Sequence, residues 1–215
     1  METREVILFV FDGLSDWEIG YVTPGIQVPD FQKRPGAWRV RVVSAGGRPV
    51  TTMGGLRVLP EGPLEETDPA EAGMLVLPGG MAWERGGNGE ALDLAARFLE
   101  AGVPVAGICG ATYGLARAGL LDRRRHTSNA REYLAATGYL GGDLYEEAPA
   151  VTDGDVITAP GVSPVDFALH IFRRLDLFTP PVAEAWFGLF KTGRPEFFAA
   201  LGSALEKGAP SGAER

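Results

Sequence analysis

The sequence predicts a doubly wound α/β domain, and two observations carry this prediction. Short apolar runs rich in β-branched residues recur along the chain, as strands covered on both faces of a parallel sheet do. Helical patterns alternate with these runs, and no repeat or low-complexity linker divides residues 1–178. We therefore expect one α/β domain over residues 1–178, with helices flanking a mostly parallel sheet.

The expected strands follow one another along this segment. Four single runs and two strand pairs are Val6–Phe11, Val40–Ser44, Met74–Leu77, Val103–Ile108, Val50–Thr52 with Leu56–Leu59, and Val151–Thr152 with Val156–Thr158. Each pair flanks a short glycine-containing segment of the kind found in hairpin turns. We expect the first pair to form a hairpin excursion and the second to form a later hairpin or strand pair.

Two crossover helices are expected between the strands, Glu90–Ala101 and Pro164–Leu175, because each carries an apolar stripe at helical spacing. The chain changes character after Phe178, where two prolines end the preceding helix. Two amphipathic helices rich in aromatic residues follow, Val182–Lys191 and Pro195–Lys207. Residues 179–215 are thus expected to form a C-terminal helical extension and tail, packed on the domain itself or on a second subunit.

Composition excludes several classes of function. With 45% hydrophobic and 22% charged residues, the chain resembles an ordinary globular protein. Its net charge of −8 would repel a polyphosphate, so we expect no nucleic-acid partner. The first apolar run, Val6–Phe11, is far too short to span a membrane, and no secretory cleavage pattern accompanies it. We expect a cytoplasmic protein without a membrane partner.

The reactive side chains are few. Cys109 is the single cysteine and His126 and His170 are the two histidines. One cysteine allows neither an intramolecular disulfide nor a site with several thiolate ligands. We expect no metal and no cofactor, and any mechanism that needs several imidazoles is excluded.

The clearest chemical signal is the segment Gly107-Ile108-Cys109-Gly110-Ala111, where an apolar strand meets an amphipathic helix. Small neighbours let a nucleophile occupy the strained turn between a strand and a helix, at the edge of the sheet where ligands bind. The helix N-terminus favours a thiolate, so we expect a lowered pKa for Cys109. The alternative is a buried small hydrophobic residue, as most free cysteines are.

Two other loops are expected at the same edge of the sheet. Gly79 and Gly80 follow the strand Met74–Leu77, and their amides, with that of Gly110, can form an oxyanion hole. An ordinary strand-to-helix turn is the alternative. Asp12, Asp16 and Glu18 follow the first strand and can reach the thiol, although acidic residues also occur in a first helical turn as partners of the helix dipole.

Taken together, these motifs resemble the DJ-1/PfpI family of the class I glutamine amidotransferase-like superfamily, over about residues 5–178. The resemblance rests on four segments: Asp16-Trp17-Glu18, Leu75–Gly80, Ala106–Thr112 and Gly161–Ala168. It implies a flavodoxin-like sheet, a nucleophilic or oxidisable cysteine and a homodimer. It also implies that Glu18, and not Asp12, is the carboxylate that hydrogen-bonds the cysteine.

The chain departs from the family pattern at its imidazoles. Gly110 stands where the protease-like branch has histidine, so we do not expect proteolysis. The His-x-Glu pair of the glutaminases is missing, which argues against glutaminase activity. Asn129 takes the position at which other members place a histidine; His126, three residues earlier, is a candidate substitute or else a solvated polar residue.

Three functions remain. The first is an enzyme in which Cys109 attacks a small amide-like, isonitrile-like or dicarbonyl substrate and Glu18 moves the proton, with hydrolase or hydratase chemistry. The second is a non-catalytic redox or stress-response protein in which Cys109 is oxidised. The third is a small-molecule binding module that has lost its chemistry.

Overall fold

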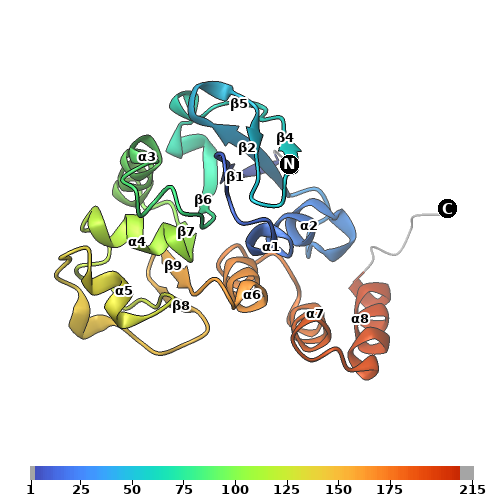
Figure 1. The fold of residues 1–215 in the computed structure, drawn as a ribbon. Helices are drawn as coiled ribbons and strands as arrows, with labels where there is room; N and C mark the ends of the chain where they lie inside the picture. Colours follow the sequence, from blue (N-terminus) through green and yellow to red (C-terminus); the bar gives the residue numbers. More distant parts are fainter. Residues whose placement is uncertain (1–2, 209–215) are drawn as a thin grey trace.

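The computed structural model describes residues 3–208 and confirms the α/β prediction (Figure 1). The strands are β1 (Arg4–Phe9), β2 (Trp38–Ser44), β3 (Val50–Thr51), β4 (Arg57–Val58), β5 (Gly62–Pro63), β6 (Ala72–Leu77), β7 (Val105–Ile108), β8 (Val151–Asp153) and β9 (Val156–Ala159). The α-helices are α1 (Asp16–Ile19), α2 (Val22–Gln27), α3 (Gly89–Glu100), α4 (Gly110–Arg117), α5 (Arg131–Ala135), α6 (Pro164–Arg174), α7 (Pro180–Thr192) and α8 (Pro195–Gly208). The expected tail beyond Gly208 lies outside the described residues.

The main sheet has seven strands in the order β5-β2-β1-β6-β7-β9-β8. The pairs are parallel except β8 with β9, which is the predicted later hairpin. The predicted excursion is a separate antiparallel pair, β3 with β4. The strand order turns at β1, because β2 lies on one side of it and β6 on the other. Open α/β sheets bind ligands at the carboxyl ends of the strands beside such a turning point.

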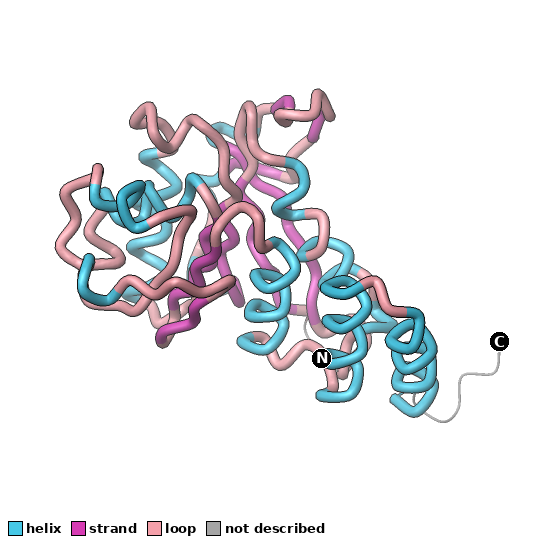
Figure 2. The backbone as a smooth tube through the Cα atoms, turned by 60° about the horizontal axis from the view of Figure 1, so that its bottom comes forward, coloured by secondary structure: helices cyan, strands magenta, loops and turns pink. Residues whose placement is uncertain are grey.

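Helices cover both faces of this sheet. In Figure 1, α3 and α4 lie on one side of the strands and α2 and α6 on the other. The contacts agree, because α3 packs on β6 and β7 while α2 packs on β2 and α6 on β9. Figure 2 shows the strands as one layer between helices, with the last two helices extending beside it toward the C-terminus. The central strands are therefore buried on both faces, as their almost continuous apolar sequences predict.

Some boundaries differ from the sequence-based expectation. The first strand ends at Phe9, where its pairing with β2 stops, although Val10 and Phe11 are also buried. These two residues belong to a loop that packs into the core, which apolar character alone does not distinguish from a strand. Helix α2 was not predicted, since it contains Pro24 and Gly25; a Cβ at Gly25 would lie 2.2 Å from the Phe172 ring.

The C-terminal helices pack on the domain itself. Trp186 of α7 is buried, and its ring meets Tyr21, Phe172 and Phe178 with centroids 5.0–6.2 Å apart. Helix α8 packs in turn on α7. Trp186 is therefore covered within one chain, while Phe190 and Phe198 stay exposed. No helix in residues 3–208 combines the length and the apolar character needed to cross a membrane.

We expect Trp186→Ala to destabilise the protein by about 3–5 kcal/mol, because it leaves a cavity at the junction of α7 with α6. Urea unfolding of the full chain measures this change. Phe198→Ala is the matched control: Phe198 is exposed on α8, so the variant should stay within about 0.5 kcal/mol of wild type. Equal effects of the two variants would mean that α7 is not anchored through Trp186.

Candidate active site

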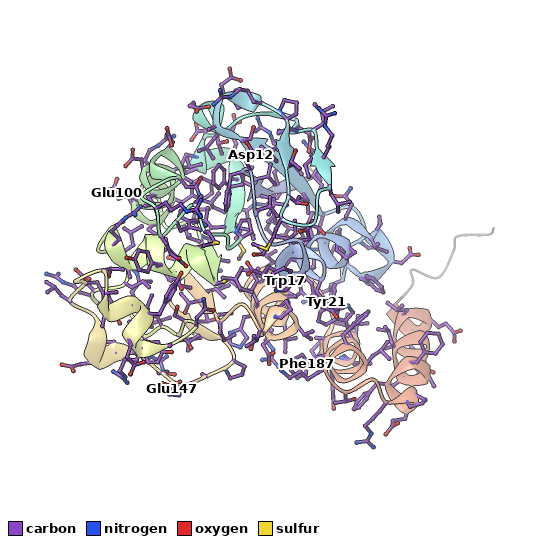
Figure 3. All side chains as sticks on the ribbon, in the orientation of Figure 1. Asp12, Trp17, Tyr21, Glu100, Glu147 and Phe187 are labelled. Atoms are coloured by element: carbon purple, nitrogen blue, oxygen red, sulfur yellow. The ribbon has the colours of Figure 1, made fainter. Side chains whose placement is uncertain are left out.

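The site lies at the carboxyl ends of four neighbouring strands, β1, β6, β7 and β9. Glu18 belongs to α1, which follows β1, and Gly79 follows β6. Cys109 directly follows β7, and Gly161 follows β9. Figure 3 labels Trp17, a residue of α1, next to the ends of the central strands and close to α6. Parallel strands thus bring residues that are far apart in the sequence to one edge of the sheet.

Cys109 occupies the predicted turn between a strand and a helix. Its φ of 56° and ψ of −122° are unusual for a residue with a side chain, and α4 begins at the next residue. The small neighbour Gly110 is required here, because a Cβ at that position would lie 2.6 Å from the carbonyl oxygen of Gly80. The side chain is partly accessible to solvent. The backbone therefore presents the thiol at the mouth of the sheet, as in a nucleophile elbow.

Glu18 is a fully buried carboxyl group. Its Oε2 atom accepts a hydrogen bond from the backbone N–H of Gly79 at 2.5 Å. Its Oε1 atom is buried and has no hydrogen-bond partner among the described residues. Burial raises the pKa of Glu18 to about 7, against the opposing effect of the Gly79 N–H. The carboxyl group is thus close to half ionised at neutral pH.

Two glycines hold the carboxyl group against the thiol. A Cβ on Gly79 would lie 2.6 Å from Cβ of Cys109 and 2.6 Å from Oε2 of Glu18. A Cβ on Gly161 would lie 2.9 Å from Sγ of Cys109 and 3.1 Å from Oε1 of Glu18. Any side chain at either position would occupy the space that the two reactive groups share. The thiol and the carboxyl therefore act on each other directly, and each changes the pKa of the other.

The expected lowering of the thiol pKa is wrong for this structure. Burial and, second, the negative charge of Glu18 raise the pKa of Cys109 to about 11. The Asn129 side chain and the Gly110 N–H favour the thiolate, but their effect is smaller. The helix N-terminus does not prevail because desolvation and a carboxylate oppose the same charge. The first proton of the pair thus leaves Glu18, and the thiol keeps its own.

Asn129, and not His126, is next to the sulfur. Its Nδ2 donates to Sγ of Cys109 at 3.3 Å, while its Oδ1 accepts from the N–H of Gly161 at 2.9 Å. The Gly161 bond fixes which end of the amide faces the thiol. His126 is buried elsewhere, with its ring nitrogens 2.7 Å from the carbonyl oxygen of Arg124 and 2.8 Å from the Tyr139 hydroxyl. The structure therefore does not bring His126 to the thiol.

The other acidic candidates hold the β3–β4 hairpin in place. Asp12 accepts from the N–H of Thr51 and Asp16 from the N–H of Gly54, each at 2.7 Å. Of the three carboxylates in this loop, only Glu18 faces Cys109. No cluster of three or more His, Cys, Asp or Glu side chains that could hold a metal ion occurs within residues 3–208.

The backbone amides divide into two roles. The N–H of Gly79 is committed to Glu18, so Gly79 shapes the site but does not serve as an oxyanion donor. The N–H of Gly80 has no hydrogen-bond partner in the described part of the chain. A Cβ on Gly110 would lie 3.1 Å from the nitrogen of Gly80, so the Gly80 and Gly110 amides are neighbours. These two amides remain as candidate donors to a developing oxyanion.

Comparison with known proteins places this geometry in a family. The model of the DJ-1/PfpI family matches residues 4–174. The chain belongs to the DJ-1/PfpI family. The "Uncharacterized protease YoaZ" of Bacillus subtilis (strain 168) is 36% identical over 210 residues, which cover 96% of this chain and 100% of the relative. A deglycase of Thermococcus kodakarensis is 33% identical over 156 residues, which cover 72% of this chain and 89% of the relative.

Solved structures of the DJ-1/PfpI family agree with the fold. The thiJ/pfpI family protein from Bacillus anthracis superposes with a TM-score of 0.88 at 37% identity, covering 95% of this chain and 98% of that chain. A DJ-1 superfamily protein from Agrobacterium tumefaciens gives a TM-score of 0.79 at 34% identity, covering 89% and 99%. The C-terminal helices are thus included in the match with the first of these structures.

Sequence reasoning assigned no role to Gly161, although the residue touches three parts of the site. A Cβ on Gly161 would lie 2.9 Å from Sγ of Cys109. The backbone of Gly161 donates to Asn129 and accepts from the indole N–H of Trp17 at 3.1 Å. The available signal was its place between a buried strand and a helix, at the same edge of the sheet as Cys109. Trp83, in contrast, is fully buried beneath the elbow and donates to the carbonyl oxygen of Pro78.

We expect Glu18→Gln to stabilise the fold more at pH 8.5 than at pH 5, by about 2 kcal/mol. The folded-state pKa of Glu18 is raised from 4.5 to about 7, so its stability contribution is present below the unfolded value and is lost as the pH rises through 7. Glutamine keeps the shape of the side chain without the charge. Urea unfolding of both proteins at the two pH values measures the difference.

Asp16→Asn serves as the control for this experiment. Hydrogen bonds lower the pKa of Asp16, led by that of Thr52, so the carboxylate stays ionised in both states across this pH range. Its effect on stability should therefore be the same at pH 5 and pH 8.5. A Glu18→Gln effect that is equally independent of pH would mean that Glu18 titrates at an ordinary value.

Proposed function

We propose that the protein is a cysteine-dependent enzyme in which Cys109 adds to a small electrophilic carbon and Glu18 acts as its general base. The observation that carries this proposal is the buried Glu18 carboxyl, with a pKa of about 7, held against a thiol that is protonated at neutral pH. A base works best when its pKa lies near the working pH. A neutral thiol beside such a base is activated at the moment of attack.

The addition step follows from these positions. The S–H proton passes to the Glu18 carboxylate while the sulfur forms a bond to the carbon. The displaced electron pair moves to the oxygen of a carbonyl substrate, or stays on the carbon of an isonitrile. Glu18, now a carboxylic acid, returns the same proton to that atom. No net charge is gained, and the adduct is a neutral thiohemiacetal when the substrate is an aldehyde.

The surrounding backbone supports the negative charge that develops on the substrate. The N–H groups of Gly80 and Gly110 are neighbours at the N-terminal end of α4 and would donate to the developing anion. Asn129 would donate a hydrogen bond to the sulfur of Cys109 while the sulfur loses its proton. An amide does not exchange protons at neutral pH, so Asn129 positions the sulfur and Glu18 does all of the proton transfer.

The substrate class in this proposal is a small amide-like, isonitrile-like or dicarbonyl compound. Relatives named protease and deglycase are in keeping with hydrolase-like chemistry. Digestion of protein chains is not part of the proposal, because no imidazole lies next to Cys109 among the described residues. Oxidation of Cys109 as the main role is disfavoured by its raised pKa, since the thiolate is the form that peroxide attacks.

The proposal also includes a homodimer in the cytoplasm. Phe190 on α7 and Phe198 on α8 remain exposed, which leaves apolar surface on the two helices for a second copy. One free thiol and no disulfide suit a reducing compartment.

We expect alkylation of Cys109 by iodoacetamide to rise with pH around a midpoint near 7, where Glu18 ionises. In Glu18→Gln the midpoint should move above about 8.5, and the rate at pH 7.5 should fall at least about tenfold. Asp12→Asn should keep the wild-type profile, since Asp12 contacts only the hairpin. The same midpoint in wild type and Glu18→Gln would remove Glu18 from the mechanism.

Turnover separates the enzyme from the two alternatives. A panel of small amides, isonitriles and dicarbonyls is incubated with wild type and with Cys109→Ala. Consumption of one class by wild type alone supports the proposal. No consumption of any class, with uptake of oxygen atoms by Cys109 in mild peroxide, would instead identify a redox protein.

A further inference from the structure

Three large apolar side chains are exposed in the segments that also supply the site residues. Trp17 is 52% exposed, Met81 54% and Val162 90%. They come from the segments that follow β1, β6 and β9, which also supply Glu18, Gly79 and Gly161; Trp17 and Glu18 both belong to α1. We call these three residues the apolar collar. Exposed apolar residues gathered at a reactive group indicate a binding surface more strongly than scattered ones do.

Trp17 is fixed next to the sulfur. Its indole N–H donates to the carbonyl oxygen of Gly161 at 3.1 Å, and a Cβ on Gly161 would lie 2.9 Å from Sγ. One backbone residue therefore links the indole ring to the thiol. The polar end of the side chain is paired, while about half of the side chain remains in water. A rigid aromatic ring with its N–H satisfied presents an apolar face at little entropic cost.

The other two collar residues are placed by the same backbone. Met81 directly follows Gly80, whose nitrogen would lie 3.1 Å from a Cβ on Gly110, the residue next to Cys109. Val162 directly follows Gly161. Both side chains thus start from positions one residue away from the groups that would contact the reacting atoms.

An aromatic pair joins α4, the helix that follows Cys109, to α5. Tyr113 is four residues after Cys109, one turn along α4, and its ring centroid is 5.1 Å from that of Tyr133. The Tyr133 hydroxyl donates to Glu84 at 2.7 Å, which ties α5 to the loop after β6.

We propose that the apolar collar binds an apolar or aromatic group attached to the reacting carbon, with Trp17 as its main contact. The inference rests on the proposed function, since it takes Cys109 as the point at which the carbon reacts. It narrows the substrate class to electrophilic carbonyl or isonitrile compounds with a hydrophobic substituent. The occupant is a small molecule, because the collar is continuous with the thiol through Gly161.

The test compares two alkylating reagents that differ in one apolar group, iodoacetamide and N-phenyl iodoacetamide. Each rate with Cys109 is divided by the rate with N-acetylcysteine, which removes intrinsic reactivity. We expect a preference for the phenyl reagent of about tenfold, typical of one aromatic contact in a partly enclosed site. Trp17→Ala should reduce the preference at least about threefold. The preference is the ratio of the two rates within one variant, so a change in thiol reactivity that affects both reagents cancels.

Two variants control for a general loss of structure. Trp17→Phe keeps an aromatic ring and should retain most of the preference. Leu140→Ala removes a more exposed apolar residue whose N–H bonds Asp122, beyond the far end of α4, and should change neither rate. Loss of the preference in Leu140→Ala as well would overturn the assignment to the collar.

Two other results would also overturn the inference. One is a wild-type protein whose Cys109 prefers the phenyl reagent no more than N-acetylcysteine does. The other is a rise of both rates in Trp17→Ala together with conversion of a dimer into a monomer by light scattering, because the collar would then be covered by a second copy. The reagents react with the thiol without turnover, so failure of the proposed enzyme activity would leave these rates unchanged and is distinguishable from failure of the collar.

Discussion

The burial of one carboxyl group against one thiol is the constraint on which the site depends. Glu18 is fully buried, and two glycines leave just enough room for it to meet Cys109. Desolvation raises the pKa of both groups. It brings the pKa of the carboxyl close to neutral pH and moves the pKa of the thiol further above neutral pH. In water the carboxyl would be an ordinary acid and the thiol a weak nucleophile. In this site the Glu18 carboxylate can act as a base toward the proton of the Cys109 thiol.

The rest of the fold keeps this pair in place at a cost in stability. The strained backbone of Cys109 is unfavourable locally, as is the buried Oε1 of Glu18, which has no hydrogen-bond partner among residues 3–208. Parallel strands buried between two helical layers hold their carboxyl ends rigidly enough to maintain them. Functional sites are the places where a fold departs from local rules, and these departures cluster within four adjoining loops.

The sequence was sufficient for the sheet and for the elbow, because strand burial and glycine spacing are local signals. Glu18 was selected over Asp12 and Asp16 by its motif position alone, and the hydrogen bonds of the two aspartates to the hairpin agree with that choice. The sign of the thiol pKa shift was not predictable, since it depends on how deeply the sulfur is buried. The approach of Asn129 to the sulfur and the burial of His126 away from it likewise depend on contacts with Gly161 and Tyr139 that no local pattern reports.

The ionisation of Glu18 itself gives the most direct test of this account. In protein labelled with carbon-13 at the glutamate carboxyls, the Glu18 resonance is assigned by its absence from Glu18→Gln, and its chemical shift is followed from pH 5 to pH 9. The account predicts a midpoint near 7, because the carboxyl is buried beside a neutral thiol. A chemical shift that shows the Glu18 carboxyl already ionised at pH 5, with a midpoint at or below the ordinary value of about 4.3, would contradict it.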